Sequence, residues 1–284
     1  MQGDAPPPSC PACGGCFRRL YVKAGYGIDR CESCGLGRTG AQDFDPASYY
    51  TADYFSGAHA DGYQDYRGEE AVLRREFART VAFIRRFRGE GRLIEIGCAY
   101  GFFLKEAQPY FRVSGIELAR EAAEDARRHG LDVLDGMADE NNMRRLGMAD
   151  VIVMLDVIEH VPDPAATLAL CARYLNPGGI LVMTTGDFGS LCARAAGRHW
   201  RLMTPPQHLW FFTTQSLRGL GEKAGLRLLA AGHPWKIVPL SLIFFQLRRM
   251  LGLRGNGQNA GGSHIGLPVN LFDAVRVVLQ KPER

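Results

Sequence analysis

From residue 91 onward, short apolar runs alternate with segments of helical period. Five of the runs are bounded by glycine, proline or charged residues, which is typical of buried parallel strands. They occupy residues 92–96, 112–116, 132–134, 150–155 and 180–184. Helical segments ending near residues 108, 129 and 175 separate them. This alternation predicts a doubly wound, mostly parallel α/β sheet with helices on both faces. Ligands bind such sheets at the carboxyl ends of the strands.

The pattern changes after the fifth strand. Two final strands are predicted at residues 226–230 and 274–279, and a short helix before them has Thr214 as its cap. The remaining residues of this part are predicted to form insertions at 186–212 and 236–268. We therefore expect one large domain over residues 91–284.

Two segments of different character precede this domain. Residues 1–40 contain cysteine knuckles, and residues 41–90 combine an aromatic-rich linker with an amphipathic helix at 69–87. Glycines at 89 and 91 are expected to end that helix. The chain is thus predicted to have three parts, of which the first two are small.

Two CxxCG knuckles pair Cys10 with Cys13 and Cys31 with Cys34. Their separation by a hairpin-length segment matches a four-cysteine zinc ribbon, in which four thiolates converge on one ion. Cys16 also lies at CxxC spacing from Cys13 and could replace a member of the set. Reduced free thiols are the alternative to a metal. Because four thiolates leave no open coordination position, the role expected for Zn²⁺ is structural.

The stretch LIEIGCAYG, residues 93–101, joins a predicted strand to a predicted helix through small residues. Gly97 and Gly101 allow the backbone to approach a ligand closely, and Glu95 can face the crevice. Glu117 lies at the tip of the next predicted strand, where an acidic residue suits a ribose diol. A structural strand–helix turn with surface acids is the alternative interpretation.

Together with MLDVIEHVPDP and LNPGG, residues 154–164 and 175–179, this turn resembles the S-adenosylmethionine (SAM) site of class I methyltransferases. The resemblance implies a seven-stranded sheet whose last strand is antiparallel and lies beside the fifth. It also implies that Glu95 and Gly97 line the methionine end of SAM, and that Glu117 holds the ribose hydroxyls. The other cofactor-binding residues that we expect are Cys98, Ala99, Gly101, Leu118, Asp135, Gly136 and Asp156.

Members of the resembled family often carry an aromatic-rich segment like residues 41–68, and this segment can lie over the SAM pocket as a lid. Simple packing of the linker against the domain is the alternative. The aromatic residues concerned are Phe44, Tyr49, Tyr50, Tyr54, Phe55, Tyr63 and Tyr66.

Methyl transfer to a hydroxyl or amine requires removal of a proton, for which histidine is the usual base. We expect His160, after the fourth strand, and His208, in a Pro-then-His-Leu stretch that the family often carries, to approach the methyl group. His199 is a third candidate, and a structural histidine is the alternative for each. Asp156, Glu159 and His160 are also similar to the segment by which ubiquinone-pathway O-methyltransferases hold a divalent ion.

Composition and charge limit the kinds of partner and the cellular location that we expect for this protein. The 284 residues are 46% hydrophobic and 23% charged, as in a globular protein, and the net charge of +4 does not by itself imply nucleic acid. The first residues lack the apolar core of a signal peptide, and the longest apolar run, at 237–245, is too short to span a bilayer. A cytoplasmic protein is therefore expected.

Basic residues greatly outnumber acids between residues 189 and 256, and residues 239–253 are amphipathic. This excess indicates an anionic substrate or peripheral contact with an anionic membrane, with a solvated basic face as the alternative. We therefore expect a SAM-dependent methyltransferase that acts on a small, anionic, sugar- or lipid-linked metabolite. The alternatives are a zinc-ribbon methyltransferase of ribosomal RNA and a non-catalytic SAM-binding module. The ribbon has no continuous basic patch, which does not favour RNA.

Overall fold

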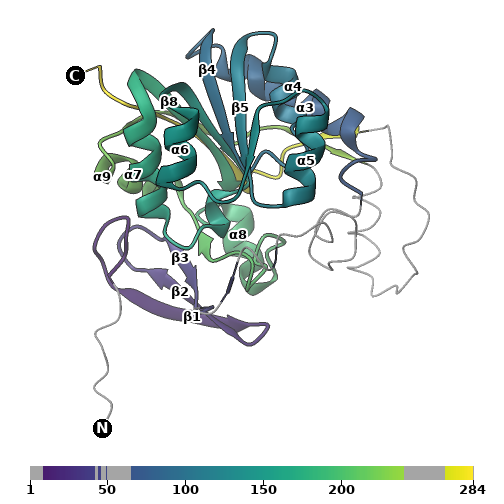
Figure 1. Cartoon of the computed structure of the whole chain (residues 1–284). Helices are drawn as coiled ribbons and strands as arrows, with labels where there is room; N and C mark the ends of the chain where they lie inside the picture. The colour runs from purple at the N-terminus through teal and green to yellow at the C-terminus, as the bar shows by residue number, and fades with distance from the viewer. Residues whose placement is uncertain (1–8, 42–43, 46–48, 50–64, 240–265, 284) are drawn as a thin grey trace.

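The structure, a computed structural model, describes residues 9–41, 44–45, 49, 65–239 and 266–283. At its centre is a seven-stranded sheet in the order β10-β13-β8-β7-β4-β5-β6 (Figure 1). In chain order the strands are β4 (Gly91–Ile96), β5 (Phe111–Glu117), β6 (Val133–Asp135), β7 (Ala149–Leu155), β8 (Leu175–Gly186), β10 (Arg227–Gly232) and β13 (Ala274–Gln280).

Strands β6, β5, β4, β7 and β8 are mutually parallel, whereas β13 runs antiparallel between β8 and β10. The order reverses between β4 and β7, so the loops after these two strands border one crevice. The predicted fold class is confirmed, including the antiparallel last strand beside the fifth.

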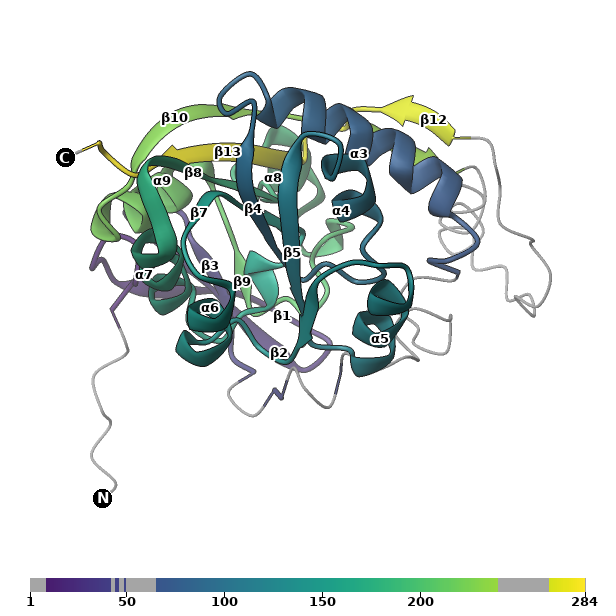
Figure 2. The same ribbon diagram turned by 45° about the horizontal axis from the view of Figure 1, so that its top comes forward.

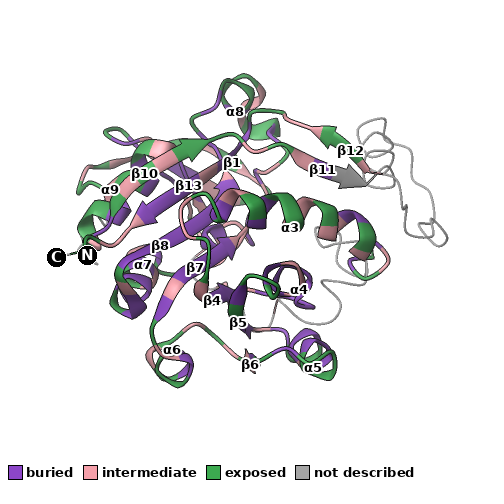
Figure 3. Cartoon of the chain, turned by 90° about the horizontal axis from the view of Figure 1, so that it is seen from above, coloured by how far each residue is buried: buried purple, intermediate pink, exposed green. Residues whose placement is uncertain are grey.

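Two apolar clusters cover the two faces of the sheet. One packs α3 (Glu70–Ile84), α4 (Phe102–Ala107) and α5 (Arg120–Arg128) against it, with Phe103 and Leu104 almost fully buried (Figures 2 and 3). The other packs helices of the opposite face, which are α6 (Glu140–Leu146), α7 (Pro164–Tyr174) and α9 (Thr214–Lys223). Burial on both faces explains why the parallel strands are nearly continuous apolar runs.

Two details of the helices differ from the sequence prediction. Helix α6 was not predicted because its seven residues are mostly polar; the Asp139 side chain caps it by accepting the Asn142 N–H. Helix α9 is capped by Thr213 and not by Thr214, so the predicted cap is wrong by one residue. Thr213 and Ser216 form a reciprocal capping box, which places the cap where both orphan N–H groups are satisfied.

The N-terminal ribbon contains β1 (Phe17–Lys23), β2 (Tyr26–Cys31) and β3 (Gly37–Thr39), and it is joined to the large domain by a sheet. Strand β3 pairs with β9 (Trp210–Phe211) to give the order β1-β2-β3-β9 (Figure 2). Between β8 and β9 lie the short helices α8 (Leu191–Ala196) and η2 (Gly197–His199). The ribbon is therefore fixed to the segment that carries His208.

A second small sheet pairs β11 (Lys236–Pro239) with β12 (Gly266–Val269). Most of the predicted amphipathic segment at 239–253 lies outside the described residues, as do four aromatic residues of the suggested lid: Tyr50, Tyr54, Phe55 and Tyr63. In the described part of the chain, no helix combines the length and the apolarity that a bilayer crossing requires.

Replacing Thr213 by valine is expected to lower the free energy of unfolding by about 1–3 kcal/mol, because a helix cap and a buried hydrogen bond are lost together. The Thr213 hydroxyl accepts the Ser216 N–H at 3.0 Å and donates to the Cys34 carbonyl at 2.8 Å, so it links α9 to the ribbon. Chemical denaturation would measure the change. Thr214→Val is the matched control, and an equal loss in both variants would contradict this assignment.

Candidate functional site

The turn after β4 brings the backbone close to both neighbouring strands. Gly97 has φ +75°, and a Cβ on it would lie 2.5 Å from Cγ2 of Val157, so only glycine fits. Its N–H donates to the Ile116 carbonyl at 2.8 Å. Glu95, on the strand before this turn, is buried, and its Oε2 has no hydrogen-bond partner among the described residues. A buried carboxylate oxygen of this kind calls for a ligand donor.

Glu117 lies at the tip of β5, next to this turn. Its two carboxylate oxygens accept the N–H groups of Ala99 at 2.7 Å and Ala119 at 2.8 Å. Burial raises the pKa of Glu117, and burial together with the charge of Glu117 raises the pKa of Glu95 well above its usual range. Because a carboxylate can accept about four hydrogen bonds, Glu117 keeps capacity for a diol. Hydroxyl donors or a positive charge would offset the cost of these two buried acids.

The remaining predicted cofactor residues lie around the same crevice, and they differ in what they offer. The thiol of Cys98 packs beneath Gly115, so Cys98 can present only its backbone to a ligand. Ala99 has φ +45°, a conformation that its hydrogen bond to Glu117 helps to hold. Gly101, with φ +74°, begins α4.

Three further predicted residues follow β5 and β6. Leu118 is half-buried directly after Glu117. Asp135 is exposed and forms an ion pair with Arg127 at 3.4 Å. The N–H of Gly136 donates to the Glu117 carbonyl at 2.9 Å, which ties the two strand tips together. These residues border the side of the crevice formed by the tips of β5 and β6.

The structure brings two of the predicted histidines together. His160, on η1 (Ile158–His160), and His208 have ring centroids 4.7 Å apart in an edge-to-face arrangement. Nδ1 of His160 lies 2.9 Å from the Gln207 carbonyl, which assigns the proton to Nδ1. His199 instead lies on the exposed helix η2, where its Nε2 accepts a bond from Arg198.

Asp156, after β7, has φ +55° and forms an ion pair with Lys236 at 2.6 Å. Lys236 was missed as a site residue because it is 80 positions away, on a strand that the sequence does not predict. The group compact enough to hold a metal ion here consists of Glu159, His160 and His208, whose ligand atoms lie within 4.8 Å of one another. Asp156 is outside this group.

Burial controls the protonation of this cluster. It lowers the pKa of His160 to about 4, and with the neighbouring His160 it lowers the pKa of His208 well below its usual range. Burial and the charge of Asp156 raise the pKa of Glu159 to about 8. Both imidazoles are consequently neutral at physiological pH and can accept a proton.

The four cysteines of the two knuckles converge in the ribbon. Sγ of Cys10 lies 3.5 Å from that of Cys34, Sγ of Cys13 lies 3.5 Å from that of Cys31, and all four are within 4.8 Å of one another. Zn–S bonds of about 2.3 Å in a tetrahedron require sulfur separations of about 3.8 Å. The cluster fits such an ion, and Cys16 is not part of it.

Glu95 and Glu117, two buried acids on adjacent parallel strands beside the glycine turn, form the candidate cofactor site. Residues 66–231 match the family model described as "Methyltransferase domain". The chain belongs to this family of methyltransferase domains.

Relatives of known structure share the fold. A SAM-dependent methyltransferase from Archaeoglobus fulgidus aligns with a TM-score of 0.52 and 17% identity, over 76% of this chain and 96% of that one. Magnesium protoporphyrin IX methyltransferase from Synechocystis, solved with bound S-adenosylhomocysteine (SAH), aligns with a TM-score of 0.50 and 13% identity, over 84% and 96%.

The curated relatives are similar over a shorter stretch. Ubiquinone biosynthesis O-methyltransferase from Aromatoleum aromaticum is 34% identical over 101 residues, which is 33% of this chain and 43% of the relative. The enzyme of the same name from Colwellia psychrerythraea is 29% identical over 153 residues, or 49% and 62%. The chain thus spans less than half of the first relative's length.

Proposed function

We propose that this protein transfers the methyl group of SAM to a hydroxyl oxygen of a small molecule. The observation that carries the proposal is the pair of neutral imidazoles, His160 and His208, at the carboxyl end of β7 beside the candidate cofactor crevice. The names of the curated relatives support a hydroxyl as the acceptor.

The turn after β4 and the tip of β5 would bind the cofactor. Glu95 and Gly97 would hold the methionine end and Glu117 the ribose hydroxyls, with Asp156 at the rim of the crevice. SAM supplies a methyl group activated by its sulfonium, so the protein needs mainly to align the acceptor oxygen with it. Alignment of this kind can lower a barrier by about 7–11 kcal/mol.

The histidine pair would remove the proton of the acceptor hydroxyl. With the proton of His160 on Nδ1 and donated to the Gln207 carbonyl, Nε2 is the basic nitrogen. As the new O–C bond forms and the C–S bond breaks, the hydroxyl proton passes to this imidazole. A general base contributes roughly a hundred- to ten-thousand-fold to the rate. Alternatively, a divalent ion held by Glu159, His160 and His208 would lower the pKa of the hydroxyl.

The acceptor that we propose is anionic and sugar- or lipid-linked, because basic residues predominate between residues 189 and 256. The test is a screen for transfer of isotopically labelled methyl from SAM to phenols, catechols and sugar phosphates, each with and without EDTA. Label recovered as an O-methyl product supports the proposal. Activity lost to EDTA and restored by Mg²⁺ assigns the proton step to a metal. Label found only in RNA, or only on nitrogen or carbon, would contradict the proposal.

We also propose that the ribbon binds one structural zinc ion through Cys10, Cys13, Cys31 and Cys34. Purified protein is expected to contain about one zinc per chain, and Cys31→Ser is expected to release it and to loosen the ribbon. Elemental analysis and limited proteolysis would measure both effects. Cys16→Ser, at an exposed cysteine outside the cluster, is the matched control. Zinc-free wild-type protein with a protease-resistant ribbon would exclude the ion.

A further inference from the structure

The face of the ribbon that is turned toward the large domain carries two arginines, Arg18 and Arg30, with no carboxylate partner among the described residues. In the register of β1 and β2, Arg18 lies directly opposite Arg30, and Arg30 lies opposite Gly37 of β3 on its other side. Within residues 9–41 and 65–239, neither arginine forms an ion pair with an acid. Like charges directly opposite each other destabilise a strand pair, so this arrangement calls for an anion.

The other face of the same strands shows how the ribbon neutralises arginines elsewhere. Arg19 lies opposite Asp29 and binds it at 2.5 Å, and Arg38 binds the same carboxylate at 3.1 Å. The contrast between adjacent residues Arg18 and Arg19 therefore reflects the two faces of one strand. Asp29 neutralises Arg19 and Arg38, whereas Arg18 and Arg30 form no ion pair with a carboxylate among the described residues.

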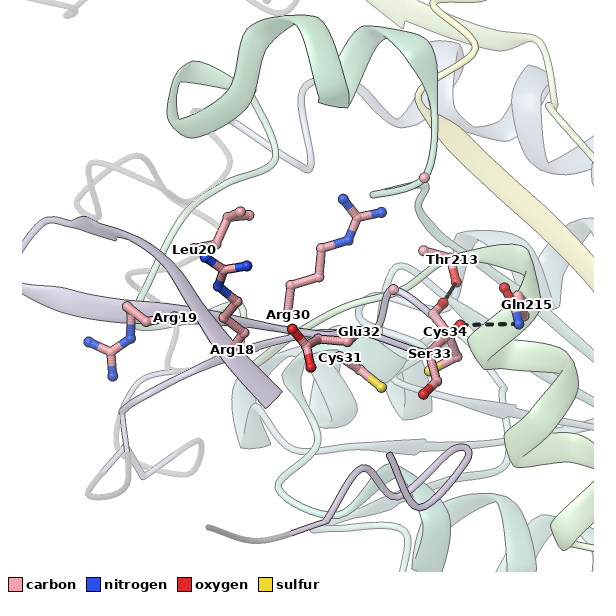
Figure 4. A pocket seen from close by; sticks show the side chains of 12 residues that line it. Arg18, Arg19, Leu20, Arg30, Cys31, Glu32, Ser33, Cys34, Thr213 and Gln215 are labelled. Carbon is pink, nitrogen blue, oxygen red and sulfur yellow. Dashed lines mark hydrogen bonds between the residues drawn. The ribbon is translucent and has the colours of Figure 1, made fainter. Parts of the chain in front are cut away.

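Arg18 and Arg30 line a hollow of about 670 Å³ between the ribbon and the large domain, and Arg19, already paired with Asp29, lines it as well (Figure 4). Figure 4 shows the guanidinium groups of Arg18 and Arg30 on one side of the strands, with the Cys31 sulfur on the other side. Gly189, Thr213 and Gln215 of the large domain also line the hollow. The volume suits a small-molecule ligand.

One acid also lines the hollow. Glu32 contributes a carboxylate, yet it forms no ion pair with either arginine in the described part of the chain. The local balance on this face therefore remains positive. A dianion that accepts hydrogen bonds from two guanidinium forks at once matches the arrangement best, and phosphate is the common biological group of that kind.

The hollow is separate from the candidate acceptor site. The Arg30 guanidinium lies 5.4 Å from the ring centroid of Phe188, which lies 5.6 Å from that of Phe211, which in turn lies 6.2 Å from that of His208. Two aromatic rings therefore stand between the arginine and the histidine pair. A ligand in this hollow would not be in contact with those imidazoles.

We propose that this hollow is an anion site, in which Arg18 and Arg30 bind the phosphate group of a small molecule. The anion site could exist in a protein that transfers no methyl group. The proposed anion site and the proposed methyltransferase activity can therefore fail separately. A small ligand is favoured over RNA because Arg18 and Arg30 face a single hollow of small-molecule size, whereas RNA binding uses a stripe of phosphate contacts.

The experiment is calorimetric titration of the full chain with inorganic pyrophosphate and with a sugar phosphate at constant ionic strength. We expect saturable binding to the wild type and a loss of about tenfold or more in Arg18→Gln and in Arg30→Gln, since each removes a charge-assisted contact. Arg38→Gln, which removes an arginine of the ribbon that pairs with Asp29 and does not line the hollow, is the matched control. It is expected to bind within about twofold of the wild type.

Thermal melting distinguishes a variant that has lost the binding site from a variant that is merely less stable. In phosphate-free buffer, Arg18→Gln is expected to melt no lower than the wild type, because it relieves the repulsion with Arg30. Pyrophosphate should raise the melting temperature of the wild type and not that of Arg18→Gln. Absence of saturable binding to the wild type, or equal losses in Arg18→Gln and Arg38→Gln, would overturn the proposal. Tighter binding of a short RNA with a steep salt dependence would also overturn it.

Discussion

Glu117→Ala is expected to weaken SAM binding by roughly ten- to hundredfold or more, because two hydrogen bonds to an ionised carboxylate are lost at once. The carboxylate is buried at the tip of β5 and is held by the N–H groups of Ala99 and Ala119. It is therefore oriented before the ligand arrives, and little ordering remains to oppose binding. Calorimetry with SAM measures the loss directly.

Two further variants separate binding from folding. Glu117→Gln retains one oxygen acceptor and is expected to lose less stability than the alanine variant while still binding SAM more weakly. Glu121→Ala removes an exposed acid from the adjacent helix α5 and should leave the affinity unchanged. Wild-type affinity in Glu117→Ala would exclude a ribose-binding role for this residue.

His160→Ala is expected to reduce the transfer rate to a hydroxyl acceptor by roughly a hundredfold or more, while SAM affinity stays nearly unchanged. Because the pKa of His160 is about 4, its ring is unprotonated throughout the physiological range, which is the form that a general base requires. Single-turnover kinetics with labelled SAM would isolate the chemical step from cofactor binding.

The matched control for this variant is His199→Ala, which removes an exposed imidazole on η2. Its transfer rate should equal that of the wild type. His160 is structural if His160→Ala instead lowers both the stability and the SAM affinity of the protein, while the rate of methyl transfer within the fully bound complex is unchanged. In that case alignment alone would account for the reaction, and His208→Ala would be the remaining test of a base.

The parallel core could be predicted because its signals are local. Buried strands such as residues 92–96 are continuous apolar runs, and Gly97 and Gly101 mark a turn that only small residues can form. Glu95 and Glu117 could be placed at neighbouring strand tips by counting along the chain. The convergence of the four knuckle cysteines follows equally from their spacing.

The acceptor side could be predicted only in part, because its contacts join distant segments. Nothing near Asp156 indicates its ion pair with Lys236. The pairing of β3 with β9 depends on one three-residue and one two-residue strand, which are too short to show a period. That pairing fixes the segment on which His208 meets His160, so their juxtaposition emerges only in three dimensions.

Calorimetric titration of the wild-type protein with SAH tests whether the crevice at the carboxyl ends of β4, β5 and β7 binds SAM. This measurement needs no knowledge of the acceptor. We expect saturable binding with one site per chain and a marked loss of heat in Glu117→Ala. The absence of saturable binding to folded wild-type protein at about 1 mM SAH, where even weak complexes of about 4 kcal/mol would form, would contradict the account.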